Sequence, residues 1–146
     1  MIDFTVDTHI ERPVEEVFAY STDPDRLATW QTNTVSATRE DDGPLRLGSR
    51  IREVHRAAGG KELESTVEVS EYEPGRAFGL TVVDGIPIHA RMTFEPGAQG
   101  GTLLRFNAHG RLGGGMRLAQ PLVQRVLRRQ FAKQCATLKQ VMEVGA

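Results

Sequence analysis

The chain has 146 residues, of which 39% are hydrophobic and 25% are charged, and its formal net charge is −1. This length indicates one domain, residues 1–146, with enough chain to bury a core without a metal or a disulfide staple. The near-zero charge excludes nucleic acid and an anionic membrane as the default partners.

The first forty residues predict a strand followed by two short helices. Residues 2–11 alternate between apolar and polar side chains, which is typical of a half-buried strand. Pro13 suits the first turn of a helix. Asp23 is positioned as the N-cap of a second short helix, with Pro24 as its first residue. Helices this short need a larger partner, and we expect Trp30 to anchor them as a buried apolar side chain.

The middle of the chain predicts an antiparallel meander. Turn signals occur at 42–44, 59–60, 74–75, 84–85 and 96–101, and the segments between them are rich in Val, Thr, Ile and Phe. Strands joined by such short turns pair with their sequence neighbours. We predict six strands, near residues 33–40, 48–58, 61–73, 76–84, 86–96 and 101–112.

The tail predicts one long helix, from about Pro121 to residue 143. Its apolar residues recur at helical spacing, and we place these residues on one side: Leu122, Val123, Val126, Leu127, Phe131, Cys135, Leu138, Val141 and Met142. Arg125, Arg128, Arg129 and Lys133 are expected on a solvated face. The order of elements indicates an α+β domain, in which a seven-stranded curved antiparallel sheet wraps around the C-terminal helix. The space between them can be a dry core or a cavity.

The side chains that face the helix in this arrangement are almost all apolar, as the wall of a small-molecule pocket should be. His89 and His109 fall on the opposite, solvent-facing side of their strands. The candidate ligand-binding residues are Ile51, Glu53, His55, Phe78, Leu80, Ile88, Met92, Phe94, Leu104, Phe106, Leu127 and Phe131.

Glu53 and His55 are the one suggestive polar pair, and they are the candidate catalytic residues. Three arginines at alternate positions of the strand near 48–58 must face water, which assigns Glu53 and His55 inward. The pair could orient a polar group of the ligand, or act as general base and acid. Two other interpretations stay open: a structural pair near the rim, or a shift of one residue, caused by a bulge beside Gly59, that turns both side chains outward.

Other motifs predict no further chemistry. No metal or cofactor is expected, because four scattered histidines and one cysteine offer no convergent set of ligands. The glycines at 113–115 lack the Lys-Ser/Thr of a phosphate loop, and we interpret them as a hinge. We interpret Cys135 as a buried apolar residue. No apolar run approaches the ~20 residues that cross a bilayer and no leader is visible, so we expect a cytoplasmic protein without a stable membrane anchor.

Several segments resemble the START/Bet v 1-like (SRPBCC) superfamily, and most closely its bacterial polyketide cyclase/dehydrase and lipid-transport branch. The segment IERPVEEVFAY at 10–20, followed by Asp23, Pro24 and Trp30, is similar to that family's opening. Residues 48–53 and 69–74 resemble its middle strands, and residues 121–139 resemble its closing helix. The resemblance implies the helix-grip fold. It says little about function, because the family includes binders, transporters and enzymes.

Two functions follow as hypotheses. The first is a module that binds or carries a hydrophobic small molecule, a lipid or a polyketide-like compound, which needs only the apolar walls. The second is an enzyme of the aromatase/cyclase kind, a cyclase or dehydratase, for which the sequence offers only Glu53 and His55, with Ser65 and Thr66 as further polar groups. We favour the carrier over the enzyme. A third interpretation is a protein whose own side chains fill the cavity, and a monomer and a homodimer are both compatible with the sequence.

Overall fold

The computed structural model describes residues 1–84, 87–111 and 113–144. The strands and α-helices in these ranges are β1 (Ile2–Ile10), α1 (Val14–Thr22), α2 (Leu27–Trp30), β2 (Thr34–Arg39), β3 (Arg50–Arg56), β4 (Glu62–Glu73), β5 (Ala77–Asp84), β6 (Ile88–Pro96), β7 (Thr102–Gly110) and α3 (Gln120–Val144).

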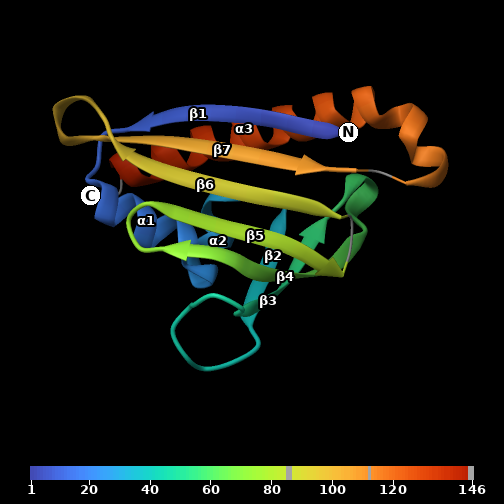
Figure 1. Ribbon diagram of the computed structural model, residues 1–146, viewed down its shortest axis with the longest axis horizontal. Coiled ribbons are helices and arrows are strands. Elements are labelled where there is room, and N and C mark those ends of the chain that lie inside the picture. The colour runs from blue at the N-terminus through green and yellow to red at the C-terminus, as the bar shows by residue number, and fades with distance from the viewer. Residues whose placement is uncertain (85–86, 112, 145–146) are drawn as a thin grey trace.

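The seven strands form one antiparallel sheet in the order β1-β7-β6-β5-β4-β3-β2. From β2 to β7 each strand pairs with its neighbour in sequence, which is the predicted meander, and β1 extends the sheet by pairing with β7. The long helix α3 runs beside β1 and β7 (Figure 1), α1 packs against β6, and α2 contacts β2 at the other edge of the sheet. The predicted α+β helix-grip fold is confirmed.

Some boundaries differ slightly from the predicted ones. α3 begins at Gln120, one residue before the predicted Pro121, and a 3-10 turn at Gly114–Ala119 precedes it. The strands predicted at 86–96 and 101–112 are β6 and β7, whereas Ile86 and Leu112 lie outside the described residues. No helix in the described ranges is long and apolar enough to cross a membrane.

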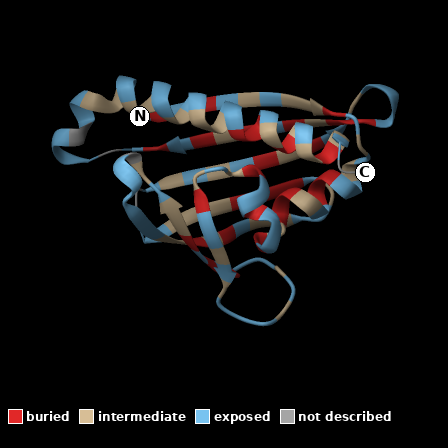
Figure 2. Ribbon diagram, turned by 180° about the vertical axis from the view of Figure 1, so that it is seen from behind, coloured by how far each residue is buried: buried red, intermediate tan, exposed pale blue. Residues whose placement is uncertain are grey.

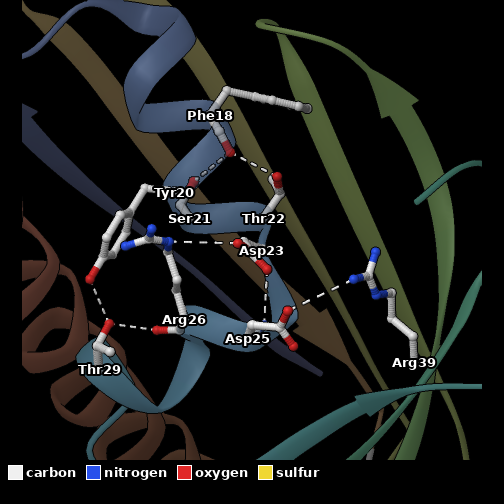
Figure 3. A network of polar contacts seen from close by, with 9 residues as sticks. All are labelled: Phe18, Tyr20, Ser21, Thr22, Asp23, Asp25, Arg26, Thr29 and Arg39. Carbon is white, nitrogen blue, oxygen red and sulfur yellow. Dashed lines mark hydrogen bonds and ion pairs between the residues drawn. The ribbon is translucent and has the colours of Figure 1, made fainter. Parts of the chain in front are cut away.

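The corner between α1 and α2 is held by side chains that bond to the backbone (Figure 3). The Asp23 carboxylate accepts a hydrogen bond from the backbone N–H of Asp25 at 3.0 Å, and so caps the 3-10 turn Pro24–Arg26 as predicted. The hydroxyl groups of Ser21 and Thr22 each donate to a carbonyl one turn earlier in α1, at 2.7 Å. These bonds fix the two side chains in place where α1 meets the cavity described below.

The side of α3 that faces the sheet is narrower than predicted. Cys135 and Leu138 are buried against the sheet, but Leu122 is 64% exposed and Val126 is 56% exposed. The prediction for Leu122 and Val126 was therefore wrong. At about 100° per residue, Val126 lies roughly half a turn around the helix from Cys135. The apolar stripe in the sequence spans more of the helix surface than the sheet covers.

The C-terminal end of α3 is fastened to the link between β1 and α1. The Arg12 guanidinium donates to the carbonyls of Met142 and Glu143 at 3.0 and 3.3 Å, which satisfies acceptors that a helix end leaves open. Lys139 donates to the His9 carbonyl and to the Glu143 carboxylate, both at 2.7 Å. The Lys139 bond lowers the pKa of Glu143. This end of the helix is therefore fastened to the sheet, and the cavity described below lies beside the middle of the helix.

Candidate ligand-binding site

A cavity of about 900 Å³ lies between the sheet and the helices α2 and α3. Its walls come from the end of α1, from α2, from β3 to β7 and from the middle of α3. Along the strands, buried and exposed residues alternate (Figure 2), because successive side chains point to opposite faces of a sheet. The cavity is therefore lined by the side chains on the inner face of the sheet.

Ten of the twelve predicted ligand-binding residues line this cavity. They are Ile51, Glu53, His55, Phe78, Leu80, Ile88, Met92, Phe106, Leu127 and Phe131. Phe106 and Phe131 stack across the sheet–helix boundary with ring centroids 4.7 Å apart. Most of this wall is aromatic or aliphatic, as expected for a site that receives apolar molecules.

Phe94 and Leu104 are not among the lining residues. Both are buried, and they pair directly across β6 and β7. The Phe94 ring packs against Phe18 of α1, with centroids 5.1 Å apart. Under α1 the space between the sheet and the helices is filled by side chains. Phe94 and Leu104 therefore belong to the dry core, although they lie on the same face of the sheet as the residues that line the cavity.

Glu53 and His55 both line the cavity. Glu53 is only 6% exposed, and its Oε1 lies 3.0 Å from His55 Nε2. The register between β3 and β4 runs without a shift from Arg50 to Arg56, whereas the irregularity lies in β2, between Thr34 and Ser36. Because β3 itself is regular, both side chains point to the same face of the sheet.

The second ring nitrogen of His55 is also engaged. His55 Nδ1 lies 3.3 Å from Thr34 Oγ1, and the Thr34 hydroxyl donates to Gln31 Oε1 at 3.0 Å. Because that hydroxyl has one proton, Nδ1 is the donor toward Thr34 in this arrangement. The 3.0 Å contact between His55 Nε2 and Glu53 Oε1 is then a hydrogen bond when one of these two atoms carries a proton. The residues Gln31, Thr34, Glu53 and His55 could thus hold a transferable proton at the cavity wall.

Sequence reasoning missed several polar residues of the wall: Gln31, Asn33, Gln130 and Gln134. Gln134 Nε2 donates to Asn33 Oδ1 at 2.8 Å, which ties α3 to the segment that follows α2. One signal could have found Gln134, since it continues the spacing of Leu127 and Phe131 along α3. We call Trp30, Asn33, Glu53, His55 and Gln134 the polar end of the cavity.

The remaining candidate groups lie elsewhere. His89 and His109 are exposed on the outer face, as predicted, and their rings stack with centroids 5.0 Å apart. Cys135 is buried, and burial raises the pKa of its thiol to about 11, against a smaller lowering by Thr8. Among the residues that the structure describes, no group of three or more His, Cys, Asp or Glu side chains could hold a metal ion.

Comparison with known proteins gives one family and many similar folds. Residues 1–143 match the family described as polyketide cyclase/dehydrase and lipid transport. Among solved structures, TTHA0849 from Thermus thermophilus is 18% identical with a TM-score of 0.83, covering 99% of each chain. The di-domain ARO/CYC BexL, from the BE-7585A biosynthetic pathway, is 18% identical with a TM-score of 0.82, covering 98% of this chain and 47% of BexL. The Aha1 dimer from Colwellia psychrerythraea is 18% identical with a TM-score of 0.69, covering 99% and 98%. A comparison with curated proteins found no significant match.

Proposed function

The chain belongs to the polyketide cyclase/dehydrase and lipid transport family, as the sequence resemblance indicated, and from this premise we propose that it binds or carries a hydrophobic small molecule. The ligand, a lipid or a polyketide-like compound, would lie in the cavity between the sheet and α3. We propose further that the protein acts in the cytoplasm, as a monomer or a homodimer.

The observation that supports this proposal is the cavity itself. A volume of about 900 Å³ is at the upper end of the range for small-molecule sites, and most of its wall is apolar. Removing an apolar molecule from water into such a space is favourable at about 25 cal/mol per Å² of buried surface. The same volume argues against the interpretation in which the protein's own side chains fill the space.

Native mass spectrometry of the freshly purified protein tests the proposal. We expect a fraction of the molecules to carry a non-covalent adduct in the mass range of a lipid or a polyketide. The adduct should disappear in denaturing solvent, which separates a bound ligand from a covalent modification. A clean apo mass under gentle conditions, together with no uptake of added apolar ligands, would count against binding.

The contacts of Glu53 and His55 favour a second candidate, a cyclase or dehydratase acting on a ligand in the same cavity. Such an enzyme needs a group that takes up and returns a proton at the substrate. Glu53 is the candidate for this role, because both ring nitrogens of His55 already face protein groups at 3.0 and 3.3 Å. The similarity to BexL, itself described as an ARO/CYC protein, agrees with this candidate at the level of fold.

Turnover and affinity separate the two candidates. The wild-type protein, Glu53→Gln and His55→Ala would each be given a poly-β-keto substrate, with product formation and binding measured in parallel. If the protein is a carrier, neither the wild type nor the two variants form product faster than the uncatalysed reaction does. If the wild type turns over the substrate, and both variants lose turnover but keep affinity, the enzyme replaces the carrier as the function.

A further inference from the structure

Two residues that line the cavity each hold a buried polar atom without a hydrogen-bond partner among the described residues: Trp30 Nε1, a donor, and Gln134 Oε1, an acceptor. Trp30 is 1% exposed and Gln134 is 3% exposed. A buried polar group without a partner costs free energy until something supplies one. Both side chains line the cavity, and a small change of side-chain rotamer on binding would let a bound molecule supply that partner.

The charges around the cavity are acidic rather than basic. Two of the lining residues are acids, Glu53 and Glu64. The one lining arginine in the described residues, Arg56, has its guanidinium 3.7 Å from the Glu62 carboxylate. A protonated His55 would be balanced by Glu53, only 3.0 Å away. The cavity therefore offers no unpaired cation, within the described part of the chain, to a carboxylate or a phosphate that entered it.

From these observations, and resting on the proposed function, we propose that the ligand is an uncharged molecule that ends in a hydroxyl group, an alcohol or a phenol, placed at the polar end. A hydroxyl oxygen accepts a hydrogen bond and its proton is donated, so one group can serve both the Trp30 donor and an acceptor such as Gln134 or Glu53. A carboxylate has no proton to donate, and its charge would lose its hydration in a largely apolar cavity in which the described residues offer no unpaired cation.

Three probes with the same apolar body test this proposal: pyrene, 1-pyrenemethanol and 1-pyrenecarboxylate. Their dissociation constants for the full-length protein at neutral pH would be measured by the fluorescence anisotropy of the pyrene ring. We expect 1-pyrenemethanol to bind most tightly and the carboxylate most weakly, with a difference of roughly tenfold or more between them. Pyrene itself should fall between the two.

Glu53→Gln should then remove most of this discrimination. The substitution keeps the shape of the side chain and removes the carboxylate that pairs with His55, so that His55 can pair with the carboxylate probe instead. This probe should therefore gain affinity, and the tenfold difference should shrink to about threefold or less. Glu40→Gln is the matched control, since Glu40 is exposed and does not line the cavity. A second variant, Trp30→Phe, removes the indole donor together with part of the ring, and it should weaken the binding of 1-pyrenemethanol more than the binding of pyrene.

The outcomes separate this inference from the proposed function. Equal binding of the three probes, or tightest binding of the carboxylate, would overturn the hydroxyl-bearing ligand and leave the carrier in place. The hydroxyl-bearing ligand is likewise overturned if Glu53→Gln, folded by circular dichroism, keeps the full preference of the wild type. If no probe binds to the wild type, both the inference and the proposed function fail.

Discussion

The double variant Ala90→Trp/Leu127→Trp is expected to bind apolar ligands at least roughly 60-fold more weakly than the wild type. Ala90 lies on β6 and Leu127 on α3, and both line the cavity. Two indole rings entering from the sheet and from the helix would take up space that the ligand needs. Keeping about 100 Å² of apolar ligand surface in water costs about 2.5 kcal/mol, which corresponds to that loss of affinity.

His89→Trp is the matched control for this variant, because His89 adjoins Ala90 on β6 but is exposed on the outer face. It should leave the affinity for 1-pyrenemethanol within about twofold of the wild type. Circular dichroism and thermal melting would show that the double variant is folded. A folded double variant that binds as tightly as the wild type would place the ligand outside the cavity.

The second large effect is a loss of stability at high pH caused by Cys135. Burial raises the pKa of this thiol from 9.0 to about 11, so the folded protein holds the proton more tightly than the unfolded chain does. The stabilising effect is complete below pH 9 and is lost as the pH rises toward about 11. Two pKa units correspond to on the order of 2–3 kcal/mol of unfolding free energy.

Urea denaturation under reducing conditions, repeated from neutral pH to pH 11, would measure this loss. Cys135→Ala supplies the correction for every other group whose protonation changes over this range. The variant should be less stable than the wild type at neutral pH, because it leaves a small cavity in the core cluster to which Cys135 belongs. The difference should narrow as the pH rises. Parallel curves for the two proteins would contradict an effect of Cys135.

The fold could be predicted because its signals are local. Alternation along residues 2–11, turn residues between the meander strands and helical spacing after Pro121 each depend on a few neighbouring positions, and each corresponds to an element of the structure. The orientation of Glu53 and His55 follows from the same kind of signal. It could be deduced because β3 has no bulge, a condition that the sequence alone did not guarantee.

The shape of the cavity could not be predicted, because it depends on where α3 crosses the sheet. Phe94 and Phe106 lie on the same face of the sheet, yet only Phe106 lines the cavity, because α1 fills the space above Phe94. The hydrogen bond between Gln134 and Asn33 joins residues that are 101 positions apart, and no local pattern relates them. The polar end is assembled by tertiary packing alone.

The central claim, that an apolar molecule binds between the sheet and α3, is tested most directly by methyl NMR during a titration with 1-pyrenemethanol. The aromatic ring of this probe shifts the resonances of methyl groups close to it. We predict large shifts for Ile51, Leu80 and Met92, which line the cavity, and little change for the buried methyl groups of Ile2, Leu104 and Leu138, which do not. Shifts confined to exposed residues such as Leu122, or spread evenly through the core, would contradict the claim.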